Sequence, residues 1–484
     1  MGATNRSKLS YVLENTPGTT PSNPVFKELR VTSSGLRFNP ERKMSNEIRS
    51  DRQVTDQILT GLAAEGPFGV ELSFGAYDDL IEAALQGTWS KKVERDNNGT
   101  ADSVITDVAT TNTVVTVTTG TGFAVGHLCL FSGFGVSGNN GLFRCSQASA
   151  TVPRFASSGI TDEAAPPAAA RIKAVGFQGA SGDITATASG LGSSSLDFTT
   201  LGIVAGEWLK IGGATSGLQF ATAALNGWAR VSAVAANAIT FDIFPTGWTT
   251  DSGTGKTVQV FFGDVLRNGT TQRPFTFERQ QQDLTSPAYE LFKGIEIAGM
   301  NWTMQAGEII AGNFSTIGRS ATVSTSRSSG ATDVAAPTYP VLNAASNVGS
   351  LLENGALVTT SYMTELGFEL NNNLAGQRAI GDLANVGIRN GEVALGGTLK
   401  AYFNDTALLS KVINDTETSI MFKAGQSSDN KNAYVFDIPR VKLTGTSEIS
   451  GKNSDRMFDG RYDALRHATL GYTVSIGRFF YLPN

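Results

Sequence analysis

Histidine and cysteine, the side chains that most often carry nucleophilic and metal chemistry, are scarce in this 484-residue sequence. The two histidines, His127 and His467, fall in different parts of the chain. A Ser-His-Asp triad needs its histidine beside a serine and an acid, and protein zinc sites combine several cysteine or histidine ligands. The sequence therefore predicts no hydrolytic triad, no cysteine–histidine pair and no multi-histidine metal cluster.

The two cysteines, Cys129 and Cys145, would form a disulfide only if their strands were neighbours. The N-terminal residues contain no apolar stretch of the kind that directs secretion, so we expect folding in a reducing cytoplasm and two buried free thiols. No segment holds about 18 consecutive apolar residues, and we expect no membrane insertion.

The remaining candidate chemistry is acidic or glycine-rich. Asp78 and Asp79 could serve carboxylate catalysis, but they open a segment with helical spacing, where they stabilise the helix dipole. No G-x-x-x-x-G-K-[ST] phosphate loop is present, and GGATSG (212–217) lacks its lysine. The net charge of −5 comes without a basic stripe, which argues against tight nucleic-acid binding. We expect no enzymatic activity and no cofactor.

The elements that would position any site are strands. The 54 glycines, together with many serines and threonines, predict an all-β protein with a few short helices. Charged residues become rare in the middle of the chain, where a motif repeats: FAVGHLCLFSG (123–133) followed by NNGLFRCSQASA (139–150) resembles IVAGEWLKIGG (203–213) followed by LNGWARVSAVAA (225–236). We expect two small β-domains here, with hairpin turns at Asn140–Gly141 and Asn226–Gly227.

The flanking sequence is duplicated as well. GVELSFGAYDDLIEAALQG (69–87) and GGTLKAYFNDTALLSKVIND (396–415) each predict a strand followed by a short helix, and matching Leu80 to Leu408 places Gly69 opposite Gly397. The predicted organisation is a first core copy at 1–97 and 267–320, an inserted outer region at 98–266 with small domains at about 98–176 and 177–266, a linker or arm at 321–354, and a second core copy at 355–484.

One stretch, MSNEIRSDRQVTDQIL (44–59), concentrates charge without an apolar face. Both alternating series of residues mix polar and apolar side chains, so neither face suits the protein's own core. Two interpretations stay open: a solvated loop, or a surface that meets a partner of complementary charge.

Several motifs, in this order along the chain, resemble the major tail tube proteins of bacteriophages with long, non-contractile tails. They are TPGTTPSNPVFKELRVTSSGL, SNEIRSDRQVTDQ, GPFGVELSFGAYDDLIEAALQGTW, FTFERQ, GIEIAGMNWTM, GGTLKAYFND and FDIPRVKLTG. The resemblance covers most of residues 11–97 and 267–484, and it concerns folding and assembly motifs. The middle region departs from the minimal family pattern and resembles the immunoglobulin-like domains that tube proteins often carry outside.

The resemblance implies a duplicated β-barrel or sandwich core whose sheets join into rings. Stacked rings would form a tube in the virion tail, assembled in the host cytoplasm, that houses the tape-measure protein and passes double-stranded DNA without specific binding. Tail tip and tail terminator proteins are the implied partners at its ends. If a ring needs six tube folds, three chains with two folds each close it with near-sixfold symmetry; the alternative is six chains with one composite fold each.

Within this assembly the charged stretch becomes the first choice for contact between subunits. The candidate residues are Glu47, Arg49, Asp51, Arg52 and Asp56. A surface adhesin or carbohydrate-binding β-domain protein is the alternative function, but an adhesin should carry an export signal. A polysaccharide-degrading enzyme would need paired carboxylates among aromatic platforms, and the five tryptophans are scattered.

Overall fold

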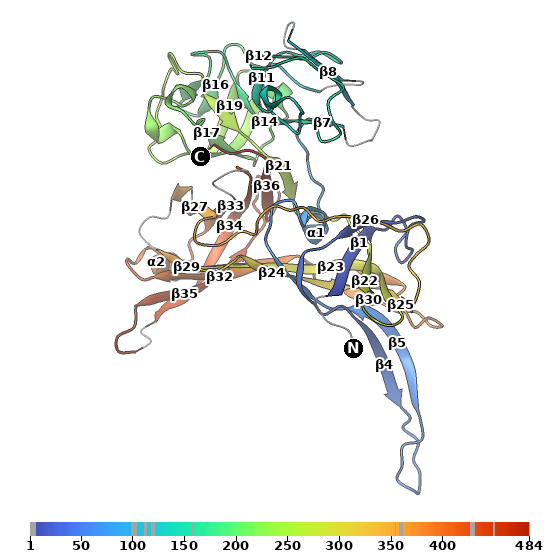
Figure 1. Cartoon of the computed structure of the whole chain (residues 1–484). Helices are drawn as coiled ribbons and strands as arrows, with labels where there is room; N and C mark the ends of the chain where they lie inside the picture. Colours follow the sequence, from blue (N-terminus) through green and yellow to red (C-terminus); the bar gives the residue numbers. More distant parts are fainter. Residues whose placement is uncertain are drawn as a thin grey trace.

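The computed structural model describes residues 6–97, 104–110, 114–117, 122–156, 159–353, 355–357, 362–425, 431–448 and 451–483. Within them the chain is mostly β-strand with two short α-helices, in agreement with the sequence. Figure 1 shows a wide lower part crossed by long strands and a compact upper part, drawn in cyan and green, that holds the low-charge middle of the chain. We call the upper part the insert.

The lower part repeats one order of elements. The first copy contains β1 (Ser7–Leu13), β2 (Val25–Glu28), β3 (Val31–Ser34), β4 (Arg37–Met44), β5 (Gln57–Glu65), β6 (Phe68–Glu71), α1 (Asp78–Ala84), β22 (Phe275–Gln281), β23 (Ala288–Gln305), β24 (Ala311–Ile317) and β25 (Ser320–Ser324). The second copy contains β27 (Val348–Glu353), β28 (Ala356–Leu357), β29 (Met363–Asn371), β30 (Ala375–Gln377), β31 (Gly387–Arg389), β32 (Ala394–Tyr402), α2 (Ala407–Ile413), β33 (Thr418–Gly425), β34 (Ala433–Glu448), β35 (Met457–Ala464) and β36 (Ser475–Phe479). Two further strands, β21 (Asp264–Arg267) and β26 (Thr332–Val334), pair with β36 and β2.

The two copies agree in the irregularities of their sheets as well as in their order. β3 pairs with β6, and β29 pairs with β32, and each pairing contains a β-bulge near its start. The extra residue is Thr32 in the first copy and Thr364 in the second. Because a bulge re-aims every side chain that follows it, its repetition fixes which residues of the two copies are equivalent.

The bulges correct one detail of the alignment. Directly after them, Ser33 pairs with Gly69 and Glu365 pairs with Lys400. Gly69 is therefore equivalent to Lys400, and its predicted match with Gly397 is wrong. The reason is the connection between strand and helix, which is shorter in the second copy (403–406) than in the first (72–77).

Both copies share one hydrophobic core. Along β23, Met300 and Trp302 point into it and are almost fully buried, whereas Asn301 and Thr303 alternate with them and are exposed. Leu370 and Phe368 on β29 continue the buried row, and they pair directly with Met300 and Trp302. This alternation is typical of a sheet with one face on the core and one face in water.

The insert is a second sheet in which the repeated motif occurs twice. It contains β7 (Glu94–Asp96), β8 (Ile105–Ala109), β9 (Val114–Val117), β10 (His127–Ser132), β11 (Gly141–Gln147), β12 (Arg154–Ala156), β13 (Glu163–Ala164), β14 (Arg171–Gln178), β15 (Thr185–Thr187), β16 (Gly190–Gly192), β17 (Trp208–Ile211), β18 (Trp228–Ala235), β19 (Ala238–Ile243) and β20 (Gln259–Phe261). The motif strands are β10 with β11 and β17 with β18, and the pairing of β14 with β20 joins the two halves.

Equivalent asparagines hold the loop of each motif. The side-chain amide of Asn140 donates to the Phe134 carbonyl (2.9 Å) and its oxygen accepts from the Phe134 amide (3.0 Å). Asn226 makes the same two bonds to Phe220, at 3.0 and 2.9 Å. The predicted hairpins are present, because β10 pairs with β11 and β17 with β18. The asparagines lie at the ends of longer loops (133–140 and 212–227), so the predicted position of the turns at Asn140–Gly141 and Asn226–Gly227 is wrong. Their side chains satisfy loop backbone groups that would otherwise lack partners.

His127 makes the stability of the insert depend on pH. Its Nδ1 accepts from the Ala124 amide (2.9 Å) and its Nε2 lies 3.3 Å from the Leu201 carbonyl, so the neutral ring fits the site. Burial lowers the pKa of His127 to about 4. An unfolded histidine titrates near 6.5, so the neutral ring contributes stability that is complete above about pH 6.5 and is lost as the pH falls toward 4.

His127→Gln keeps an acceptor and a donor but cannot titrate. Between about pH 6.5 and 4 the variant should lose less unfolding free energy than the wild type, by up to about 3 kcal/mol. Urea unfolding of both proteins across this window measures the difference. His467→Gln serves as the control, and an equal effect of both substitutions would contradict the assignment to His127.

Candidate assembly surfaces

No enzymatic centre emerges from the described part of the chain. Among those residues no group of three or more histidine, cysteine, aspartate or glutamate side chains is arranged to hold a metal ion. The helices found there are too short or too polar to cross a membrane. His127 lies in the insert and His467 in the second copy, as the sequence separation indicates. The prominent features of the described chain are surfaces that join parts of the molecule.

The first such surface is the seam between the two copies. β23 and β29 pair antiparallel over seven residue pairs, from Gly299 with Asn371 to Gln305 with Glu365. One sheet thus runs from the first copy into the second without a break in backbone hydrogen bonding. The seam joins the first copy to the second through their backbones.

The exposed face of this sheet is polar across both copies. One row of directly paired residues crosses five strands and consists of Asn313, Asn301, Glu369, Gly396 and Asp463. These residues line a shallow depression of about 400 Å³. On the same face Arg461 pairs with Glu369, and Lys400 pairs with Glu365 at 3.1 Å. The cations of this region are therefore compensated locally.

A hairpin of the second copy also crosses the seam. We call β30, β31 and residues 378–386 the seated hairpin. Arg378 forms a two-pronged ion pair with Glu41 of β4, with bonds of 2.5 and 2.6 Å. The Asn385 side chain donates to the Gly318 carbonyl (2.9 Å), and the Leu62 amide donates to the Leu383 carbonyl (2.7 Å). The seated hairpin thereby packs on the first copy.

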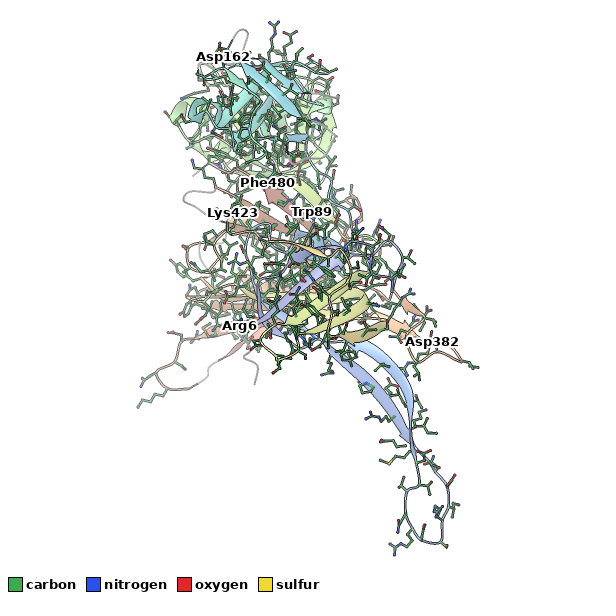
Figure 2. The ribbon with its side chains drawn as sticks, turned by 45° about the vertical axis from the view of Figure 1, so that its right-hand side comes forward. Arg6, Trp89, Asp162, Asp382, Lys423 and Phe480 are labelled. Atoms are coloured by element: carbon green, nitrogen blue, oxygen red, sulfur yellow. The ribbon has the colours of Figure 1, made fainter. Side chains whose placement is uncertain are left out.

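The end of the equivalent hairpin of the first copy lies away from the body of the described structure. We call β4, β5 and residues 45–56 the projecting hairpin; Figures 1 and 2 show it extending far below the body. Its residues 44–59 are exposed apart from partial burial of Ser45 and Leu59. An isolated two-stranded ribbon has little stability in water. We therefore expect the projecting hairpin to pack against another molecule.

The five sequence-predicted contact residues all lie at the far end of the projecting hairpin, and the contacts recorded for them are local. Arg49 binds Asp51 at 2.9 and 3.0 Å, and the Thr55 hydroxyl donates to Glu47 at 2.9 Å. The Arg49 guanidinium lowers the pKa of Asp51. Arg52 has a left-handed φ of 58°, and Asp56 accepts from the next backbone amide.

Exposed apolar side chains on both hairpins escaped the sequence analysis. Met44, Ile48, Val54 and Ile58 are all exposed on the projecting hairpin, Ile48 completely. The seated hairpin exposes Ile380 completely, and Leu383 and Val386 in part. Because the two hairpins are equivalent in the duplicated copies, the sequence alignment of the copies could have identified the apolar residues of the seated hairpin. Such gathered exposed apolar residues mark interaction sites.

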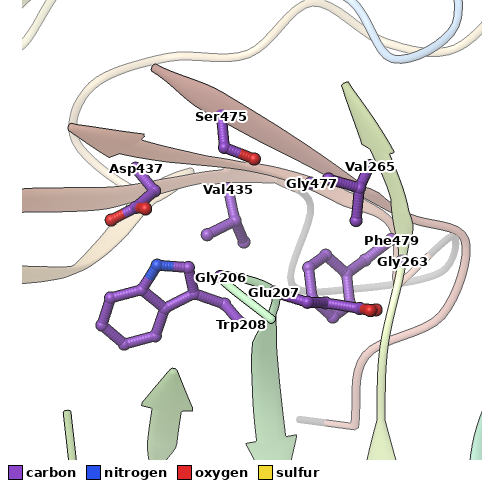
Figure 3. Close-up of a pocket in the computed structure, with 10 residues that line it drawn as sticks. All are labelled: Gly206, Glu207, Trp208, Gly263, Val265, Val435, Asp437, Ser475, Gly477 and Phe479. Atoms are coloured by element: carbon purple, nitrogen blue, oxygen red, sulfur yellow. The ribbon is translucent and has the colours of Figure 1, made fainter. Parts of the chain in front are cut away.

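The insert is fixed to the second copy, although it interrupts the first copy in sequence. Trp208, Trp228 and Phe261 of the insert pack in one apolar cluster with Val435 and Phe479 of the second copy. Figure 3 shows Trp208 and Glu207 of the insert facing Val435, Asp437 and Phe479 across a cavity of only about 10 Å³. The joint is thus closely packed.

Buried charges complete this joint. Arg230 of the insert binds Asp242 at 2.8 Å and Asp437 of the second copy at 3.3 Å. The Tyr472 hydroxyl donates to Asp437 at 2.9 Å. Burial raises the pKa of Asp437 and the nearby Arg230 opposes the shift. Nearby, Arg478 binds Asp264 at 2.7 Å.

The two β-rich copies share one sheet, and the molecule exposes an apolar hairpin and a polar sheet face. These features are typical of a structural protein that associates with copies of itself. The phage tail tube protein family matches residues 4–272 and again residues 238–474, so the chain belongs to that family and contains its domain twice. A comparison with curated proteins returns no match. Membership makes the chain a non-enzymatic component of the phage virion tail that associates with itself.

Removing Arg230 tests the charged joint. In Arg230→Met, Asp437 loses its cation while it stays buried, so at neutral pH we expect a loss of about 3–5 kcal/mol of unfolding free energy. The loss should shrink as the pH falls and Asp437 takes up a proton, and Arg230→Met combined with Asp437→Asn should restore most of it. Urea unfolding followed by tryptophan fluorescence measures each variant.

Arg440→Met is the matched control, because Arg440 pairs with Glu417 at the surface of the second copy. Exposed pairs contribute about 0–1 kcal/mol. Equal losses in both single variants would contradict a special role for the buried pair.

Proposed function

We propose that this chain is the tube subunit of a long, non-contractile phage tail. It polymerises into rings that stack into a tube, which conducts the genome and houses the tape-measure protein. The observation that supports this most strongly is the β23–β29 seam, because it joins two tube copies by continuous sheet. Repetition of that kind of junction around an axis would produce a closed wall without free strand edges.

We propose further that three chains close each ring. A ring of six tube folds needs three chains when each chain supplies two. The matching bulges and the matching element order support two equivalent folds per chain. The resulting ring has threefold symmetry that is close to sixfold, and it carries three inserts.

In this assembly the polar face of the sheet lines the lumen. Arg461 and Lys400 are each paired with a glutamate, while Asp459 and Asp463 add negative charge. Each phosphate neutralised by a protein cation adds affinity for DNA. A wall whose cations are already compensated lets double-stranded DNA pass without specific binding.

The projecting hairpin would contact a neighbouring subunit. Glu47, Arg49, Asp51, Arg52 and Asp56 form charged contacts there in our proposal. Ile48 and Val54 support it, because their exposed apolar surface gains stability on burial. If the tip of the hairpin reaches the next ring, hairpins would remain free at one end of a tube and the surfaces that they contact would remain free at the other, which leaves places for the tail tip and tail terminator proteins.

We also propose a division of the chain into two tube copies, a linker and an outer region. We assign residues 1–97 and 267–320 to the first tube copy, 321–354 to a linker and 355–484 to the second copy. Strands near these boundaries pair across them: β25 extends the sheet of the first copy into the linker, β27 extends that of the second, and β7 joins the sheet of the insert. Residues 98–266 form the outer region, with immunoglobulin-like small domains at about 98–176 and 177–266. Its packing on the second copy supports a fixed outer decoration. Assembly takes place in the host cytoplasm.

Electron microscopy of the concentrated protein, with tail initiation components present, tests the function directly. We expect hollow tubes, and native mass spectrometry of released rings should give three chains. Protein that remains monomeric under these conditions would contradict the tube function. Tubes with six chains in each ring would contradict the threefold ring alone.

Charge reversal tests the projecting hairpin. Arg49→Glu together with Arg52→Glu should reduce tube formation at least tenfold while the monomer keeps its circular dichroism spectrum, because the contacts would become repulsive. Sedimentation and electron microscopy measure the polymer. Lys91→Glu with Lys256→Glu makes the same charge change outside the hairpin and should leave polymerisation intact. If the hairpin variant polymerises as well as the wild type, residues 44–59 are a solvated loop and not a contact surface.

A further inference from the structure

The long central strand of each copy has two halves with different neighbours. In the first copy, the last residues of β23 lie between β24 on one side and β29 on the other. In the second copy, residues 441–448 of β34 pair with β35 on one side. Within the described residues, the pairs of β34 with β33 and β36 lie in its earlier part, up to Val441. The edge of 444–448 is therefore open where its counterpart in β23, from Gly299 onward, is covered by β29.

The matching open edge belongs to the start of the first copy. β29, which covers β23, is the counterpart of β3 and the beginning of β4. Those strands pair with β6 and β5 on one side. In the described structure no strand pairs with residues 31–39 on the other side, which is the side that β29 turns to β23. The chain thus presents two complementary edges, one at each end of its sheet.

We propose that residues 444–448 of β34 pair antiparallel with residues 35–39 of a second copy of this chain. The inference rests on the proposed function, and it names the two strands that join successive chains in a ring. The interface is head to tail, because each chain offers its second copy to the first copy of the next. The β23–β29 seam inside the chain is the template.

The template also gives the register. On the polar face, Asn301 pairs with Asn313, and Asn313 pairs with Gly69. The counterpart of Gly69 is Lys400, which pairs with Asp459, and Asp459 pairs with Thr446. Thr446 is therefore the counterpart of Asn301.

The opposite strand follows in the same way. Asn301 pairs with Glu369 across the seam. Glu365 corresponds to Ser33 through the shared bulge, so Glu369, four residues later, corresponds to Arg37. Thr446 of one chain should then lie directly opposite Arg37 of the next.

Side chains at the two edges suit this junction. Phe38 packs against the shared core and is only partly buried, whereas its counterpart Leu370 is 3% exposed beneath β23. A second chain over this edge would complete the burial of Phe38. One carbonyl of the edge, that of Leu36, accepts from Arg279 at 2.8 Å. Arg279 satisfies this group in the free chain.

The hairpins give the seam a second contact by the same symmetry. The seated hairpin binds the corner at Gly318 and Arg319, where β24 meets β25. The corresponding corner of the second copy follows β35, at Ala464 and Leu465. The base of the projecting hairpin of the next chain should lie against it, beside a depression of about 660 Å³ that Arg440 and His467 help to line.

Cysteine pairs test the register. Directly opposite residues of antiparallel strands have Cα atoms about 4.5–5.5 Å apart, which fits a disulfide. Arg37→Cys with Thr446→Cys should therefore give, after mild oxidation of tubes, a ladder of linked chains that ends at three on a non-reducing gel. The native Cys129 and Cys145 are buried and contribute no background.

Arg37→Cys with Lys442→Cys is the control, because Lys442 lies on the same face of β34 but about 14 Å further along the strand. The proposed register would be contradicted if both cysteine pairs formed disulfides in oxidised tubes, or if neither did. Either result would leave the tube function intact. Wild-type protein that forms no tubes would instead refute the function.

Hydrogen exchange covers the case in which the cysteine variants fail to assemble, because it uses the wild-type chain. Amides of residues 444–448 that face away from β35 should exchange at least about tenfold more slowly in tubes than in monomers. Equal exchange in both states would overturn the proposal.

Discussion

A strand edge carries a row of amide and carbonyl groups that must be bonded to something, and the arrangement of this molecule follows from where those bonds are made. In the middle of the chain the edge of β23 is satisfied internally, because β29 of the second copy lies against it. The same requirement at the ends of the sheet leaves two edges, and in the proposed ring each edge is satisfied by a different neighbouring chain. Sheet continuity, a shared core and the direction of the polar face are all consequences of this one type of pairing.

The insert obeys a different constraint. It enters the sequence between α1 and β22 of the first copy, yet its apolar base lies on β34 and β36 of the second. Strand β21 makes this possible, since it leaves the insert and pairs with β36 before the chain returns to β22. Buried charges such as Arg230 and Asp437 fix the orientation of this joint, because an unpaired charge there would be costly. The two copies are therefore similar in fold and different in what they carry.

Part of this was predictable from the sequence. The strand content follows from the alternation of polar and apolar residues. The duplicated copies and the repeated motif of the insert follow from matching residues that keep the same spacing in each repeat. The match of Gly69 with Gly397 failed because a gapless alignment cannot register the connection between strand and helix, which is two residues shorter in the second copy (403–406) than in the first (72–77). The turn predicted at Asn140 failed for a related reason: Asn-Gly also occurs where a side chain closes a longer loop. The contact between the insert and the second copy left no periodic signal, because it joins residues such as Trp208 and Phe479 that are far apart in the chain.

The projecting hairpin shows the limit of composition as a guide. Its charges were conspicuous, whereas the exposed Ile48 and the equivalent Ile380 of the seated hairpin became apparent only when burial was known.

The measurement that tests the central claim most directly is an electron cryomicroscopy reconstruction of the assembled tube that resolves individual strands. The account predicts that the strand beside residues 444–448 of β34 is the segment 35–39 of the next chain, in the register of the β23–β29 seam. A wall in which another segment, or none, lies beside those residues would contradict it.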